Sequence, residues 1–285
     1  MFLITDRAGR FSLLKACCLA LLLAPALWLG WQALNHDLGP LPIKQALHDS
    51  GKLAVRFLLI TLALTPLQRL FRWPKLAIVR RMLGVGAFCW AAAHLVFYVA
   101  SQKFDLAQVA SEIFSRYYLT IGFIALTGLA LLAATSTDGM ISRMGPWWKR
   151  LHRAVYVIAV LAILHFFMQS KLDASEATLM AGLFLTLMIY RLAIWFRLPM
   201  GAVMLAGVAL AGAAATALAE FAWYGLATGA NPWRVLDANL HVGQGLRPAV
   251  EVLLVAAAVA LSAEIWRRLP SRKGSPSGLR EPRRA

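Results

Sequence analysis

Long runs of apolar residues, separated by short polar and basic segments, dominate the chain from Leu13 to Trp266. A helix that crosses a membrane needs about 20 consecutive, mostly apolar residues. Eight stretches satisfy this requirement: Leu13–Trp31, Leu53–Leu70, Leu83–Ala100, Tyr117–Ala134, Leu151–Met168, Ala177–Phe196, Met200–Phe221 and Ala249–Trp266. The pattern therefore predicts an all-α membrane protein, a polytopic bundle of about eight transmembrane helices.

Composition supports lipid as the solvent of this chain. Hydrophobic residues make up 60% of the sequence and charged residues 15%, whereas soluble proteins hold about 45–50% and about 25%. No small-residue cleavage site follows the first apolar run, which we interpret as a retained helix. We expect residues 1–197 to form a six-helix core, 198–266 two further helices, and 267–285 a disordered basic tail.

The positions of the basic residues predict the orientation of the bundle. If the N-terminus is cytoplasmic, 21 of the 29 Lys and Arg residues fall on the cytoplasmic side, as the positive-inside rule requires. Both termini are therefore expected in the cytoplasm, with the chain in a bacterial inner membrane. The formal net charge of +16 does not indicate a nucleic-acid partner, because no soluble domain is long enough to present a basic face.

The cysteines and glycines of the chain exclude several kinds of site. Cys17, Cys18 and Cys89 lie in apolar runs, without the spacing of a disulfide framework or a metal site. No Gly-rich phosphate loop follows a strand pattern. A flavin or nicotinamide domain is therefore not expected in this chain, and electrons from a nucleotide would have to come from another protein.

Two histidines lie within predicted spans at matching depth. His94 follows Arg81 by 13 residues and His165 follows Arg150 by 15, so a rise of about 1.5 Å per residue puts both in the outer half of the membrane. Ionisable side chains at this depth are costly and are candidates for function. Two imidazoles on facing helices are what a low-spin heme needs as axial ligands. The alternative is a histidine hydrogen-bonded to a neighbouring helix.

His152 is a third candidate, with its role left open. It precedes His165 by 13 residues, about 20 Å along a helix, and points about 140° away from it on a straight helix. It could bind a second heme with an unusual partner, contact a quinone or flavin, or do neither. His36, His48 and His241 fall in predicted outer loops, where we interpret them as solvated residues.

Several motifs resemble the ferric-reductase-like transmembrane family. The first set comprises Leu64–Leu67, Arg80–Gly84, Trp90–His94 and Tyr98. The second set is closer still to the heme-binding membrane subunit (MsrQ type) of the periplasmic methionine sulfoxide reductase system: Thr135–Thr137, Gly145, Trp148–Arg153, Tyr156 and Ala162–His165, together with His36–Gly39 and Gly51–Phe57. The resemblance covers about residues 10–197, so the last two predicted helices are an addition to it.

The resemblance implies an electron-transfer subunit without its own substrate active site. Such subunits take electrons from the quinone pool or a cytosolic flavin reductase and pass them to a periplasmic molybdenum-containing reductase that repairs oxidised methionine. The implied cofactors are heme b and FMN. By position the heme ligands would be His94 and His165, with His152 as the third histidine of the family.

Two other functions fit parts of the sequence. A stand-alone transmembrane ferric or quinone reductase usually carries flavin and nicotinamide domains, which are not expected here. A transporter or scaffold with structural histidines is the other alternative. Transporters often show internal repeats, and none is apparent in the sequence.

Overall fold

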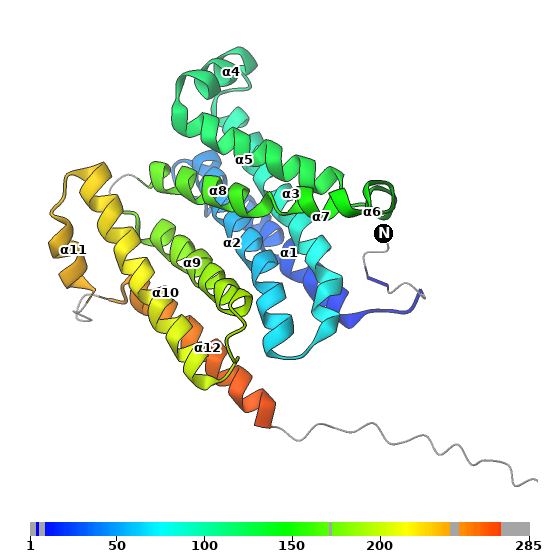
Figure 1. Ribbon diagram of the computed structural model, residues 1–285. Helices are drawn as coiled ribbons and strands as arrows, with labels where there is room; N and C mark the ends of the chain where they lie inside the picture. The colour runs from blue at the N-terminus through cyan, green and yellow to red at the C-terminus, as the bar shows by residue number, and fades with distance from the viewer. Residues whose placement is uncertain (1–3, 6–8, 171–172, 240–244, 269–285) are drawn as a thin grey trace, which may run out of the picture.

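The fold is a bundle of α-helices, and the computed structural model describes residues 4–5, 9–170, 173–239 and 245–268 (Figure 1). The described residues contain no β-strand. The long helices are α1 (Leu13–Leu34), α2 (Pro42–Leu70), α3 (Ala77–Ser101), α5 (Tyr117–Ala134), α8 (Val155–Gln169), α9 (Ser175–Trp195), α10 (Ala202–Trp223) and α12 (Pro248–Arg268). The short ones are η1 (Pro74–Leu76), α4 (Leu106–Ser115), α6 (Asp138–Met144), α7 (Pro146–His152), η2 (Tyr224–Thr228) and α11 (Pro232–Ala238).

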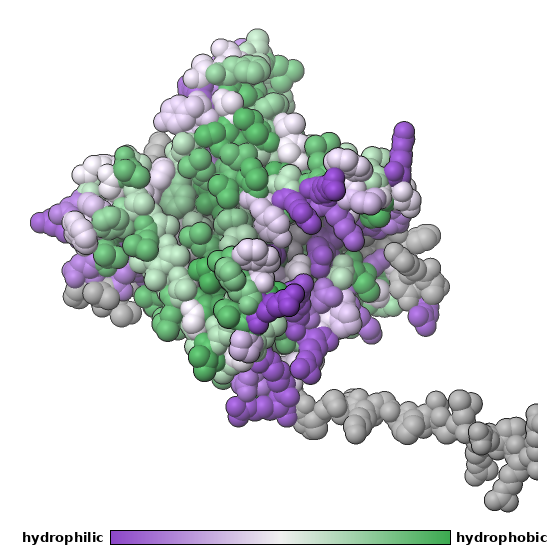
Figure 2. All heavy atoms as spheres, viewed as in Figure 1, coloured by the Kyte–Doolittle hydropathy of each residue, from purple (hydrophilic) through white to green (hydrophobic). Residues whose placement is uncertain are grey.

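Eight helical segments of the described chain are long and apolar enough to cross a membrane. Each overlaps one of the eight predicted spans, so the chain is a multi-pass helical membrane protein, as predicted. The surface agrees, because apolar side chains such as Leu27, Val203 and Leu226 are 73%, 88% and 89% exposed. Figure 2 shows hydrophobic residues over α10 and α5, whereas hydrophilic residues gather around α6, α7 and the end of α12. Lipid in place of water removes the cost of this apolar surface.

Helix α2 begins eleven residues before its predicted span, and this corrects the interpretation of His48. Pro42 occupies the first turn, where proline costs no hydrogen bond and its fixed φ suits a helix. The polar turns that follow extend α2 beyond its apolar part. His48 is therefore an exposed helical residue and does not lie in a loop. His36 does lie in a turn, with a positive φ of 59°, while His241 falls outside the described residues.

The bundle has one extended core, and α9 connects it to the C-terminal helices. Buried residues of α1, α2, α3, α5, α8 and α9 form a continuous apolar cluster. A second cluster joins the ends of α2 and α9 to α10 and α12 through residues such as Leu70, Tyr190, Leu205 and Ala263. The predicted boundary at residue 197 thus falls between helices that pack together, as the grouping of α9, α10 and α12 in Figure 1 also shows.

Three short helices are fixed by side-chain caps, which satisfy backbone N–H groups at a helix start. Asp105 caps α4, Thr137 caps α6 and Asn231 caps α11. Helix α12 includes Arg267 and Arg268, so the first two residues of the predicted tail are helical. Residues 269–285 of that tail lie outside the described residues.

The buried carboxylate of Glu220 connects α10 to the end of α11 and to the residue before α12. Glu220 on α10 is 1% exposed. Its Oε1 accepts a hydrogen bond from Arg247 Nη2 at 2.6 Å, and its Oε2 accepts one from Asn239 Nδ2 at 2.9 Å. A charge buried to this degree is tolerated only with such partners, so this cluster ties α10, α11 and the start of α12 into one unit.

Candidate functional site

The structure brings His94 and His165 together. His94 lies on α3 and His165 on α8, and their ring centroids are 6.2 Å apart with the planes at 82°. The depth matching from the sequence therefore identified two side chains that meet across the bundle. A metal bound by nitrogen on two sides, at about 2 Å each, fits a separation of this size, although edge-to-face aromatic pairs also lie about 4.5–7 Å apart.

Hydrogen bonds to backbone carbonyls define which nitrogen of each ring carries the proton. His94 Nδ1 lies 2.8 Å from the carbonyl oxygen of Leu47, and His165 Nδ1 lies 2.8 Å from that of Tyr118. A carbonyl oxygen only accepts, so each Nδ1 must donate its hydrogen. In a neutral imidazole the Nε2 atom then keeps its lone pair. This is the arrangement in which protein histidines usually bind metals.

Two glycines allow the histidines to approach the neighbouring helices. A Cβ atom added at Gly51 of α2 would lie 2.8 Å from His94 Nδ1, and one at Gly122 of α5 would lie 2.7 Å from His165 Nδ1. Any larger residue would push the ring away from the carbonyl one helical turn earlier. Gly51 and Gly122 are therefore part of the site, a role that their positions in apolar helices did not predict.

The two halves of the site are a structural repeat with an offset of 71 residues. Leu47, Gly51 and His94 in the hairpin of α2 and α3 correspond to Tyr118, Gly122 and His165 in the hairpin of α5 and α8. Each histidine lies 47 residues after the residue whose carbonyl it meets. This correspondence was not apparent in the sequence, because it is carried by one glycine and one histidine per hairpin amid apolar residues that differ.

A cavity of about 1320 Å³, called the basic cavity below, lies farther along the same four helices. Its wall includes Arg80, Arg81, Lys149, His152, Arg153 and Arg191. The repeat extends into this wall, because its lining contains pairs that are 71 residues apart: Leu58 and Leu129, Thr65 and Ser136, Arg81 and His152, Gly84 and Val155. Arg81 thus occupies the place in the first hairpin that His152 occupies in the second.

His152 lies in the basic cavity and apart from the His94–His165 pair. Its ring stacks on Trp148 with centroids 3.9 Å apart, and its Nδ1 donates to the Trp148 carbonyl at 3.1 Å. Ser136 Oγ lies 3.3 Å from Nε2, but its hydrogen is used in a shorter bond of 2.7 Å to the Leu132 carbonyl. His152 Nε2 therefore keeps an available lone pair. Helix α7 ends at His152 before α8 begins at Val155, so the straight-helix angle does not apply to it.

The motif residues around His152 build the turn between α5 and α8. Trp148 Nε1 donates to the Thr135 carbonyl at 2.9 Å, and Thr137 caps α6. Gly145 joins α6 to α7 with a φ of +53°, a conformation that favours glycine. These contacts explain why this stretch holds a specific pattern without contacting the His94–His165 pair.

Trp90 and Tyr98, which lie about one helical turn on either side of His94 on α3, have structural roles. Trp90 is buried and donates from Nε1 to the Leu22 carbonyl of α1 at 3.3 Å. Tyr98 donates from its hydroxyl to Glu112 of α4. Gly84 lines the basic cavity, whereas the space at Gly86 is filled by Leu22. Of these two glycines on α3, Gly84 faces a cavity and Gly86 does not.

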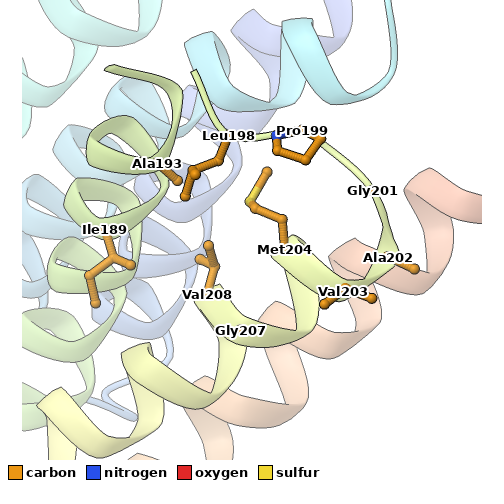
Figure 3. A pocket seen from close by; sticks show the side chains of 10 residues that line it. All are labelled: Ile189, Ala193, Leu198, Pro199, Gly201, Ala202, Val203, Met204, Gly207 and Val208. Carbon is orange, nitrogen blue, oxygen red and sulfur yellow. The ribbon is translucent and has the colours of Figure 1, made fainter. Parts of the chain in front are cut away.

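A second cavity of about 600 Å³ lies at the loop between α9 and α10 (Figure 3). Its wall is apolar and includes Ile189, Leu198, Met204 and Val208. Its lining offers no titratable side chain and, beyond the thioether of Met204, no metal ligand, so we assign it no chemistry.

Among the described residues no group of three or more His, Cys, Asp and Glu side chains could hold a bare metal ion. A heme iron needs only two protein ligands, because the porphyrin supplies the other four. The paired Nε2 atoms therefore suit a heme better than an isolated ion.

The fold and the paired histidines define a multi-pass membrane protein with two facing imidazoles inside its bundle. Comparison with known families is consistent with this class: residues 50–163 match the family described as Ferric reductase like transmembrane component. The matched segment contains His94 and His152 and ends two residues before His165. No solved structure was found to match the chain. The match supports a ferric-reductase-like membrane electron-transfer component.

Proposed function

We propose that this chain is a b-type-heme electron-transfer subunit, in which His94 and His165 are the axial ligands of one heme. The proposed electron donor is the quinone pool or a cytosolic flavin reductase. The proposed acceptor is a periplasmic molybdenum-dependent methionine sulfoxide reductase that repairs oxidised proteins, as the MsrQ-type resemblance implies.

One observation carries the proposal. Both rings donate Nδ1–H to a backbone carbonyl at 2.8 Å, and within the described chain neither Nε2 has a hydrogen-bond partner. A histidine with a purely structural role would use both nitrogens, since an unpaired polar group inside a membrane is costly. Two such atoms on facing rings support a shared ligand between them.

Each residue of the site has a defined part in this proposal. When bound, heme supplies one-electron redox chemistry. The carbonyls of Leu47 and Tyr118 hold the imidazoles in the Nδ1–H tautomer and make Nε2 more basic, as such partners commonly do for metal-binding histidines. Gly51 and Gly122 permit the short approach of each ring to its carbonyl.

The direction of electron transfer rests on the positive-inside rule. With Arg80, Arg81 and the basic turn Lys149–Arg153 on the cytoplasmic side, electrons would enter near the basic cavity and leave at the end that carries α4 and α11. This orientation, the inner-membrane location and the periplasmic partner are parts of the proposal. FMN is included on the resemblance alone, and flavin fluorescence of an acid extract of the purified protein tests it.

An absorption spectrum of the protein in detergent, before and after dithionite reduction, tests the proposal. A Soret band and a sharp α band on reduction are expected, and both should disappear in His94→Ala and in His165→Ala. His36→Asn is the control, because His36 is exposed in the turn after α1, and asparagine tolerates its positive φ of 59°. A colourless protein from heme-replete cells would refute the heme assignment.

The ratio of heme to protein in the same sample addresses His152. One heme per chain, unchanged in His152→Ala, leaves His152 as a contact for another ligand. Two hemes, one of which is lost in His152→Ala, assign it the second iron.

A further inference from the structure

Among the residues that the structure describes, the lining of the basic cavity holds more cationic than anionic side chains. Besides Lys15 of α1, five cationic side chains line it: Arg80 and Arg81 of α3, Lys149 of α7, Arg153 just after α7, and Arg191 of α9. Within the described lining the one carboxylate is that of Asp138, which pairs with Arg81 at 2.5 Å. In the part of the chain that the structure describes, Arg80, Lys149, Arg153 and Arg191 have no carboxylate at salt-bridge distance.

Two of these arginines are held in the wall by neutral partners. Arg191 donates to the carbonyls of Leu62 and Leu187 at 2.6 and 3.2 Å and lies over the ring of Tyr156. Arg80 donates to the side-chain oxygen of Gln68 at 3.2 Å, and its Nε is buried without a partner. Both guanidinium groups line the same cavity. Such a pair inside a bundle is costly unless an anion joins it.

The rest of the wall indicates an amphiphilic ligand. Leu58, Leu62 and Leu129 give an apolar side, and Thr61, Thr65 and Ser136 add hydroxyl groups. His152 Nε2 is an acceptor there, suited to a ligand hydroxyl. The volume of about 1320 Å³ is ample for a small molecule, since ligand sites usually measure about 300–1,000 Å³.

We infer that the basic cavity binds a phosphate ester, with the phosphate between Arg80 and Arg191 and the hydroxyls beside it toward His152. Guanidinium groups bind phosphate with paired hydrogen bonds, and basic pockets between membrane helices on the cytoplasmic side bind anionic headgroups. The ester has two available sources, an anionic phospholipid of the adjacent leaflet or a soluble mononucleotide. This inference does not depend on heme at the His94–His165 pair.

Two pairs of probes test the inference: the lipids differ in the net charge of the headgroup, and the flavins differ in whether a phosphate is present. The full-length protein is placed in nanodiscs of phosphatidylcholine alone or with phosphatidylglycerol, and in detergent it is titrated with flavin mononucleotide, riboflavin or inorganic phosphate. Thermal unfolding and native mass spectrometry report binding. We expect one of two results. Either phosphatidylglycerol raises Tm and binds at least tenfold more tightly than phosphatidylcholine, or flavin mononucleotide raises Tm and binds at least tenfold more tightly than riboflavin.

Variants connect that binding to the cavity. Arg80→Gln and Arg191→Gln should weaken binding at least tenfold, and Arg153→Gln, at an exposed position that should tolerate change, should weaken it as well. Arg197→Gln is the control, because Arg197 is exposed and outside the cavity. A response to phosphatidylglycerol alone identifies the lipid as the source, and a response to flavin mononucleotide alone identifies a soluble ester. Equal binding of riboflavin and flavin mononucleotide with no effect of the lipid, no binding of any probe, or a second heme in the cavity would each overturn the inference.

Discussion

Substitution of Gly122 by alanine tests the proposed site at its most constrained contact. The new Cβ would lie 2.7 Å from both Cε1 and Nδ1 of His165, whereas non-bonded heavy atoms prefer about 3.5–4.0 Å. The ring must therefore move by roughly 1 Å. A shift of that size away from Tyr118 lengthens the 2.8 Å bond beyond the range of a hydrogen bond.

The expected cost has two parts. Loss of the hydrogen bond costs about 0.5–1.5 kcal/mol, and overpacking at the contact of α5 with α8 costs about 1–3 kcal/mol. Loss of the partner that orients a metal-binding histidine typically weakens metal affinity about 10–100-fold. Gly122→Ala should therefore reduce heme occupancy by about that factor when heme is limiting. Gly51→Ala, with its Cβ 2.8 Å from His94 Nδ1, should behave alike because of the repeat.

Heme titration of the apoprotein, followed by the Soret absorbance, measures this effect. Gly128→Ala is the matched control: its Cβ would lie 2.8 Å from Ile158, so it crowds the same two helices without contacting His165. The control should lower Tm and leave heme affinity unchanged. If folded Gly122→Ala binds heme as the parent protein does, with the same spectrum, the carbonyl and glycine have no role in positioning His165.

Three further outcomes are expected. Glu220→Gln should destabilise the protein by about 2–4 kcal/mol, because it leaves Arg247 with a partly buried and unpaired charge; the double variant with Arg247→Gln should recover part of this loss in thermal unfolding, and strict additivity would contradict the pairing. Trp148→Phe should lower the free energy of unfolding by about 0.5–1.5 kcal/mol, since it removes the hydrogen bond to the Thr135 carbonyl while a ring remains beside His152. A loss of heme with no fall in Tm would contradict a structural role. At the start of α9, the Ser175 N–H holds the pKa of Asp173 below its ordinary value of 3.8, with help from Lys52 and Arg247; the stabilisation by the carboxylate is thus full above that value and is lost as pH falls through the lowered one. Asp173→Asn should therefore lower the free energy of unfolding at pH 7 by less than about 1 kcal/mol at this exposed position, which is measured as a small fall in Tm. The difference should vanish in acid, and a difference that persists there would contradict the electrostatic cause.

The long elements of this fold were predictable because each is determined by local composition. A run such as Tyr117–Ala134 has one stable solution in lipid, a helix that satisfies its own backbone, and its predicted bounds agree with α5. The depth of His94 and His165 followed from helix rise alone. Their approach to 6.2 Å depends on how α3 and α8 pack, which composition does not specify.

The remaining features depend on contacts between segments far apart in sequence. The carbonyl of Leu47 has no sequence signature, since every residue has one, and a glycine in an apolar helix has many uses. The signal that was available is the equal spacing of Gly51 to His94 and of Gly122 to His165. The basic cavity escaped prediction for a related reason: Arg80 and Arg191 belong to different spans and read singly as topology signals. The short helix α4 carried a weaker local signal, its Asp105 cap.

The division of the histidine pair between two hairpins has a consequence for assembly. The hairpin of α2 and α3 is synthesised first, and on its own it offers one imidazole, already held to the Leu47 carbonyl. The second imidazole arrives only after α8 has entered the membrane and docked. A cofactor bound by both imidazoles would therefore bind only after both hairpins have inserted, and it would then crosslink them. Its release should loosen the contact of α3 with α5 and α8 before either hairpin opens.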